Sequence, residues 1–274
     1  MSEKTNERSV QELLEDLNKA VNAGDVREAG VSFGSLGRAM VSEGRQQRAA
    51  LYFESALTIH RSQNDPWGAL LDLRSQGEAL LGTTGDVATA LSCLSQAAEI
   101  GEALKVPEGE DVRARYEVIL RMIEEKNPEQ VQVLKAKLQE DPEGVRAAGI
   151  EALLESGPLA TAYFDDQLAV ATVLGDAGGI FFSLGSLSQV LIDGGEYRAA
   201  HASLELAKAQ IPSIEMPRQQ LEDMMMQWRA GVRSAIDQSG QDITYDGMKP
   251  SPDEDLEALR RDAVQRLTSV TEAS

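Results

Sequence analysis

Three kinds of sequence feature are scarce in this chain, and each scarcity excludes a class of protein. Cys93 is the single cysteine, which rules out an internal disulfide framework and a zinc site built from several thiolates. Aromatic residues make up only 4% of the sequence, which argues against an aromatic-rich β-sandwich or β-barrel. Apolar residues never run for the roughly 18 consecutive positions that a membrane-spanning helix needs.

Basic residues are also in the minority, because 26 Lys and Arg stand against 45 Asp and Glu, for a net charge of −19. A non-specific nucleic-acid binder needs a basic surface, and anionic membranes likewise attract basic segments. We therefore expect neither nucleic acid nor membrane insertion. The polar start of the chain lacks the apolar core of a secretory signal, which favours a cytoplasmic protein.

The sequence nevertheless contains enough apolar residues for a folded core, 42% of 274 residues, and they are arranged in repeats. Segment 31–40 (VSFGSLGRAM) resembles segment 182–191 (FSLGSLSQVL) at an offset of 151 residues. Segment 52–57 (YFESAL) resembles segment 163–168 (YFDDQL) at an offset of 111 residues. The two offsets differ by 40 residues, which indicates a repeat unit of that length.

Each unit keeps small and large residues at fixed distances. Gly37, Ala49, Phe53 and Ala56 are separated by 12, 4 and 3 positions. The steps of 4 and 3 place the last three on one face of a helix, and the step of 12 spans a turn. The pattern recurs, with one extra turn residue in the first case, at Gly77, Ala90, Leu94 and Ala97, and at Ser188, Ala200, Leu204 and Ala207. It predicts pairs of closely packed antiparallel helices.

The junctions between units also repeat, as Ala23-Gly24-Asp25, Gln63-Asn64-Asp65 and Leu174-Gly175-Asp176. With these junctions, residues 26–104 and 143–211 resemble the tetratricopeptide repeat (TPR) family, in its subclass with units near 40 residues. The resemblance implies a right-handed solenoid of antiparallel helix hairpins. It also implies that the first helix of each hairpin lines a concave groove that holds a peptide or helix of a partner protein.

The sequence thus predicts an all-α fold with a repeat domain over 1–238, a linker over 239–251, and an amphipathic helix with a tail over 252–274. Prolines fall at or beside the expected helix boundaries, where they cost least. Five hairpins are expected between an initial helix and a helix that caps the solenoid. In order, these elements cover 7–23, 26–63, 66–104, 109–140, 143–174, 177–211 and 217–238.

Two features near the C-terminus leave alternatives open. Met224-Met225-Met226 and Trp228 give the 217–238 helix a broad apolar side, which either covers the last hairpin or remains exposed for partners. Ser251 and Pro252 resemble the start of a helix, with serine as its cap. This helix has an apolar stripe that includes Leu256, Leu259 and Leu267, which marks it as a possible docking helix.

The partner-binding groove is expected on first-helix residues that point away from the packed face: Val31, Arg38, Leu71, Arg74, Glu78, Phe182 and Gln189. Arg38 and Arg74 would be basic positions on an acidic protein. Arginine binds carboxylates through two parallel hydrogen bonds, which suggests acidic side chains or a C-terminal carboxylate on the partner. Ordinary surface ion pairs are the alternative interpretation of both arginines.

No residue pattern indicates catalysis, a metal site or a cofactor. His60 and His201 lack metal-ligand neighbours one helical turn away, and Cys93 lies on a core-facing stretch. An enzyme would need one of these histidines beside a carboxylate in a deep cleft.

The sequence therefore predicts a non-enzymatic scaffold or adaptor that binds a segment of another protein in its groove. A regulatory protein whose groove is occupied by its own 252–270 helix is one alternative. An enzyme is the other alternative, and both depend on contacts that the sequence does not specify.

Overall fold

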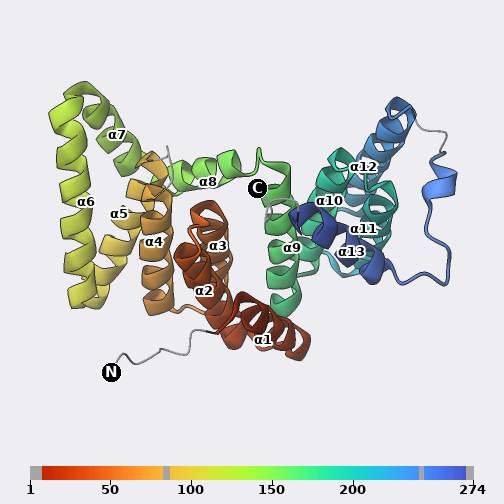
Figure 1. The fold of residues 1–274 in the computed structure, drawn as a ribbon, viewed down its shortest axis with the longest axis horizontal. Helices are drawn as coiled ribbons and strands as arrows, with labels where there is room; N and C mark the ends of the chain where they lie inside the picture. Colours follow the sequence, from red (N-terminus) through yellow and green to blue (C-terminus); the bar gives the residue numbers. More distant parts are fainter. Residues whose placement is uncertain (1–7, 83–86, 241–243, 270–274) are drawn as a thin grey trace. The chain divides into compact units, whose positions relative to one another are not determined.

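A computed structural model describes residues 8–82, 87–240 and 244–269, and in these residues the chain is all-α. Thirteen α-helices and two short 3-10 segments are present in the described residues, with no strand among them (Figure 1). The expected fold class is therefore confirmed at the level of secondary structure. Residues 83–86, residues 241–243 of the expected linker and both chain ends lie outside the described residues.

The chain divides into two compact units, unit 1 over Met1–Leu153 and unit 2 over Leu154–Ser274. The boundary falls inside segment 143–174, which the repeat spacing predicts as a single hairpin. The helices of unit 1 are α1 (Val10–Ala23), α2 (Val26–Ser42), α3 (Gln46–Ser62), α4 (Pro66–Leu81), α5 (Val87–Leu104), α6 (Pro107–Lys126), α7 (Pro128–Glu140) and α8 (Pro142–Leu153).

The junctions between hairpins share one backbone geometry. Gly24 and Asn64 take left-handed conformations, with φ of 67° and 52°, and so end α1 and α3. The aspartate that follows each of them caps the next helix, because its side chain accepts a hydrogen bond from a first-turn N–H. At these two junctions the pair therefore ends one helix and caps the next; at the third, Gly175 is also left-handed, but the Asp176 side chain makes no capping hydrogen bond to α10.

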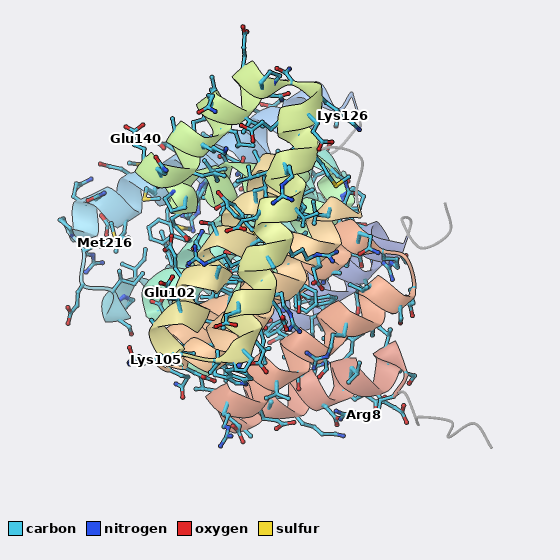
Figure 2. The ribbon with its side chains drawn as sticks, turned by 90° about the vertical axis from the view of Figure 1, so that its left-hand side faces the viewer. Arg8, Glu102, Lys105, Lys126, Glu140 and Met216 are labelled. Carbon is cyan, nitrogen blue, oxygen red and sulfur yellow. The ribbon has the colours of Figure 1, made fainter. Side chains whose placement is uncertain are left out.

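The junction between α5 and α6 has the same geometry without the same residues. Lys105 takes a left-handed conformation, with φ of 56°, and the N–H of Val106 donates to the carbonyl of Gly101 at 3.1 Å. Pro107 then begins α6 in place of a capping aspartate. Figure 2 shows α6 between the labelled Lys105 and Lys126, and α7 ending at Glu140.

Close contact between small and large residues sets the distance between paired helices. A Cβ added to Gly37 of α2 would lie 2.6 Å from the ring of Phe53 on α3, so no larger residue fits there without movement. Glycine also permits the approach of α5 to α6, because a Cβ on Gly101 would lie 2.3 Å from the Cα of Gly109. The spacing that repeats in the sequence therefore corresponds to direct contact in unit 1.

The short helix α8 is held in unit 1 by charged side chains. The buried guanidinium of Arg146 forms ion pairs with Glu54 of α3 and with Glu143 of α8. Arg61 of α3 donates to both carboxylate oxygens of Glu143, at 3.1 and 3.2 Å. α8 also packs on α5, where Ser92 donates to the carbonyl of Pro142. Segment 143–174 is therefore split, because α8 is bound to α3 and α5.

Unit 2 contains α9 (Gly157–Leu174), α10 (Ala177–Asp193), α11 (Tyr197–Gln210), α12 (Arg218–Gln238) and α13 (Leu256–Ser269), with 3-10 segments η1 (Ile211–Ser213) and η2 (Asp246–Met248). α12 packs on α10 and α11. Its Trp228 lies over Gly185 of α10, where an added Cβ would come within 2.3 Å of the indole ring. Met225 is buried and Met226 is exposed, so only part of the methionine cluster faces the core.

The C-terminal helix begins later than the sequence predicts. α13 starts at Leu256, and Asp255 rather than Ser251 accepts a hydrogen bond from a first-turn N–H, that of Ala258. Ser251 instead donates its N–H to Glu254, in a turn before the helix. The prediction that Ser251 caps the helix is therefore wrong. The residues from Ser251 to Glu254 form a turn of their own, and Asp255 caps the helix that follows.

α13 packs on α9 and α11, the second helices of their hairpins. Its buried Arg260 pairs with Asp165 of α9, and Arg266 pairs with both oxygens of Glu196 at 2.8 and 2.7 Å. Leu267 fits against Gly194, where an added Cβ would lie 2.7 Å from its methyl groups. An apolar stripe and two arginines thus join α13 to unit 2.

Replacing Phe53 with alanine should lower the free energy of unfolding of unit 1 by about 3–5 kcal/mol, because the fully buried ring would leave a cavity beside Gly37. Hydrogen exchange read separately for peptides of α2–α5 and of α9–α12 would assign the loss to unit 1. Val118→Ala, at an exposed position of α6, is the control and should change little. Equal losses in both variants would contradict the packing described for Gly37 and Phe53.

Attachment of α8 should weaken in acid. Burial raises the pKa of Glu143, but hydrogen bonds from Arg146 and Arg61 outweigh burial and lower that pKa to about 2. A lowered pKa contributes stability above the unfolded value near 4.5, and this contribution is lost as the pH falls from there toward 2. Hydrogen exchange of α8 should therefore accelerate over this range, and Glu143→Gln should exchange faster already at pH 7. The control is Glu151→Gln, on an exposed position of α8; matching behaviour of the two variants would refute the attachment.

Candidate functional site

The expected groove residues of unit 1 lie together on two neighbouring first helices. We call this surface the α2–α4 face; it is formed by Val31 and Arg38 of α2 and by Leu71, Arg74 and Glu78 of α4. α2 and α4 contact each other, and they begin 40 residues apart, at Val26 and Pro66. Val31, Arg38 and Glu78 are exposed, whereas Leu71 and Arg74 are half-buried.

Arg38 and Arg74 form no ion pair with any other described residue. Arg38 donates to the hydroxyl of Ser35 at 3.0 Å, and the Nε of Arg74 is buried without a hydrogen-bond partner in the described part of the chain. Glu78, by contrast, lies 3.8 Å from the guanidinium of Arg115 on α6. The surface ion pairs considered for the two arginines are therefore not formed within the described residues.

Trp67 belongs to the same surface, although the sequence analysis did not include it. Its side chain is 41% exposed at the start of α4, and it precedes Leu71 and Arg74 by four and seven positions. That spacing places all three on one side of the helix. Helical periodicity extended back by one turn from Leu71 was the available signal. Trp67 and Val31, which is 44% exposed, give the α2–α4 face an apolar component.

Phe182 and Gln189, the other expected groove residues, lie on α10 in unit 2. Phe182 is 39% exposed, and its ring contacts that of Phe181 edge-on at 5.4 Å between centroids. Gln189 is half-buried beside Gly231 of α12. Since Trp228 covers Gly185 between them, α12 occupies part of the surface that the repeat pattern assigns to a partner.

The leucines of the expected docking helix face unit 2 to different degrees. All three leucines are half-buried, and of the three Leu267 packs against the hydrophobic core cluster of unit 2. Because α13 packs on α9 and α11, occupation of a first-helix groove by this helix would require it to leave those contacts.

His60 of α3 and Asp72 of α4 form a buried pair that the sequence analysis did not foresee. The Nδ1 atom of His60 lies 2.6 Å from an Asp72 carboxylate oxygen. Gly30 and Gly68 make room for the imidazole, because an added Cβ on either would lie within about 3 Å of it. The pair links two helices whose contact residues are 12 positions apart, a separation that no helical period reveals.

The two members of this pair influence each other's protonation. The hydrogen bond to Asp72 raises the pKa of His60, against burial, which lowers it. Burial raises the pKa of Asp72, against the opposing effects of His60 and of the nearby Arg38 charge. The hydrogen-bonded carboxylate therefore favours a protonated imidazole inside unit 1.

The remaining candidates for chemistry lie apart from this pair. Cys93 is buried, with its Sγ 3.3 Å from the Oε1 of Gln76, and His201 is buried in unit 2. In the described ranges, no group of three or more His, Cys, Asp and Glu side chains is placed to hold a metal ion. None of the helices described for this chain is both long and apolar enough to cross a membrane.

Comparison with known proteins gives no relative, since no family model, curated protein or solved structure matches this chain.

Replacing Asp72 with asparagine should lower the pKa of His60, because the carboxylate that raises it is removed while burial remains. The raised pKa stabilises wild-type unit 1 below pH 6.5, the usual histidine value, and this contribution is lost as the pH rises through the folded-state value. Imidazole signals followed by NMR would measure the change, with His201 as the internal control in unit 2. A His60 pKa that stays constant or rises in Asp72→Asn would contradict the assignment.

Proposed function

We propose that this chain is a non-enzymatic interaction scaffold of the TPR-like type, and that its α2–α4 face binds a segment of a partner protein. The proposal rests on the resemblance of the repeats, on the packing of paired helices, and above all on two arginines without ion-pair partners among the described residues. The partner segment carries carboxylate groups, from acidic side chains or from a free C-terminus.

Charge supports this choice of partner chemistry. The chain as a whole carries a net charge of −19, so an acidic partner segment is repelled by most of its surface. Arg38 and Arg74 are an exception, since each guanidinium offers a planar pair of donors that matches a carboxylate. The buried and unpaired Nε of Arg74 gains the most, because an unpaired buried donor carries a desolvation penalty that a bound carboxylate would remove.

The apolar residues of the face support binding of a protein segment rather than a free ion. Trp67 is exposed on α4 and Val31 is exposed on α2. Tryptophan and arginine are enriched among the residues that contribute most of the binding energy in protein interfaces. Their helices are held by buried side chains on the opposite side, such as Phe33 and Leu73. The face is thus preorganised, which reduces the entropy lost on binding.

Reversal of both charges tests this proposal. Peptides selected from a displayed random library on the wild-type protein should carry acidic residues or need a free C-terminus. Arg38→Glu combined with Arg74→Glu should weaken their binding by about 100-fold or more, since two charge-assisted contacts become repulsive. Fluorescence anisotropy with labelled peptides would measure the affinities.

A control variant carries the same charge change elsewhere in unit 1. Lys126→Glu combined with Lys137→Glu alters two exposed lysines of α6 and α7, and peptide affinity should then fall by no more than a few-fold. Circular dichroism would verify that both variants remain helical. Selection of peptides that bind the arginine variant as tightly as wild type, or the absence of any selected peptide, would reject the α2–α4 face as the binding surface.

A further inference from the structure

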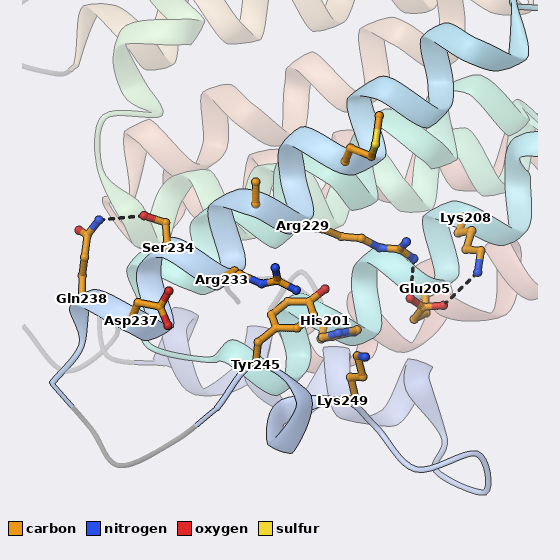
Figure 3. A pocket seen from close by; sticks show the side chains of 12 residues that line it. His201, Glu205, Lys208, Arg229, Arg233, Ser234, Asp237, Gln238, Tyr245 and Lys249 are labelled. Atoms are coloured by element: carbon orange, nitrogen blue, oxygen red, sulfur yellow. Dashed lines mark hydrogen bonds and ion pairs between the residues drawn. The ribbon is translucent and has the colours of Figure 1, made fainter.

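A pocket in unit 2 lies between α11, α12 and the segment that contains η2. Its volume is about 680 Å³, and Figure 3 shows the side chains that surround it. His201, Glu205 and Lys208 reach it from α11, and Tyr245 and Lys249 reach it from the chain around η2. The contribution of α12 is Met226, Arg229, Ala230, Arg233, Ser234, Asp237 and Gln238. The volume is sufficient for a small organic molecule.

The lining of this pocket is cationic, in contrast to the chain as a whole. Four basic side chains, Lys208, Arg229, Arg233 and Lys249, share it with two acidic ones, Glu205 and Asp237. These basic residues come from three different segments, namely α11, α12 and the chain around η2. The fold therefore brings together charges that are far apart in the sequence. Such a concentration of positive charge in a concave site raises the local concentration of anions.

Some of the basic side chains already form ion pairs, and these pairs show which positive charge remains available to a ligand. Glu205 accepts from Arg229 at 2.7 Å and lies 3.9 Å from the ammonium group of Lys208. Lys249 pairs with Asp246 at 2.5 Å. The guanidinium of Arg233 instead lies over the ring of Tyr245, 4.9 Å from its centroid. Arg233 therefore has no hydrogen-bond acceptor among the residues that the structure describes, and its donors are available to a ligand.

Buried polar atoms without partners line the same pocket. His201 is only 3% exposed, and neither ring nitrogen has a hydrogen-bond partner among the described residues. The Nε of Arg229 is likewise buried and unpaired within the described part of the chain. The imidazole packs against Tyr245, with 5.0 Å between ring centroids, so the ring is held in place. Buried polar groups in folded proteins are nearly always hydrogen-bonded, which makes these atoms evidence for an absent ligand.

We infer that this pocket binds a small organic anion through its phosphate or carboxylate group. The oxyanion accepts hydrogen bonds from the guanidinium of Arg233, from the Nε of Arg229 and from the one N–H of the His201 imidazole. Its organic part lies along the apolar side chains of Met226 and Ala230, of which Met226 is 60% exposed. This site is in unit 2 and involves none of the residues of the α2–α4 face, so it goes beyond the proposed function and does not rest on it.

Two aromatic anions test the inference and identify the headgroup. Phenyl phosphate and benzoate would be titrated into the full-length protein, with uncharged benzamide as the comparison. We expect at least one of the anions to bind with millimolar or tighter affinity in calorimetry and to shift the imidazole proton signals of His201 in NMR spectra. His60 lies in unit 1, and its signals should not move.

Matched variants of α12 separate a specific site from general attraction. Arg233→Ala removes an exposed side chain of the pocket and should weaken anion binding about tenfold or more, the effect of losing a hydrogen bond to a charged group. Arg218→Ala, on the same helix but outside the pocket, should leave the affinity unchanged. A preference for one anion would assign the pocket to phosphates or to carboxylates. Binding of neither anion, or equal affinity in the two variants, would overturn the inference.

Discussion

The structure depends on the close approach of paired helices, which only small residues permit. Gly37 admits the ring of Phe53 in unit 1, and Gly185 admits Trp228 in unit 2. In each case the large residue fills the space that a side chain on the glycine would occupy. In unit 1 the contact of Gly37 with Phe53 fixes the inner side of α2 and so decides which of its residues face outward, whereas in unit 2 the contact of Gly185 with Trp228 covers the outward side of α10. The positions of Arg38 and of the other residues on the α2–α4 face follow from this packing.

Ion pairs supplement the apolar contacts of α8 and α13, two helices that lack the repeated small-and-large residue pattern. Arg146 joins α8 to unit 1, and Arg260 joins α13 to unit 2, each from a buried position and each with a carboxylate on a distant helix. Removal of one member of such a pair leaves an uncompensated buried charge, so these contacts specify where the helix packs. The packing of α8 and of α13 therefore depends on the charge state of the paired side chains, whereas the packing at Gly37 and Gly185 does not.

Local patterns predicted the helices better than they predicted the partners of those helices. The Gly-Asp and Asn-Asp junctions and the small residues identified α2–α5 and α10–α11, because caps and helical periods involve residues close in the sequence. The split of segment 143–174 depends on the pairing of Arg146 with Glu54, 92 positions away, and the His60–Asp72 pair likewise crosses between helices. The pocket is still less visible in the sequence. Arg229 and Arg233 are four residues apart and so share a helix face, but only folding adds His201 and Lys249 to them.

The most direct test of the central claim, that the α2–α4 face binds a partner protein, is photo-crosslinking from a single position. A benzophenone amino acid at Val31 lies on this face, and one at Val133 of α7 serves as a control of comparable exposure, 44% against 59%. The account predicts that the probe at Val31 yields a discrete protein adduct in cells that produce the chain and that the probe at Val133 yields none. Adducts from Val133 alone, or from neither position, would contradict it.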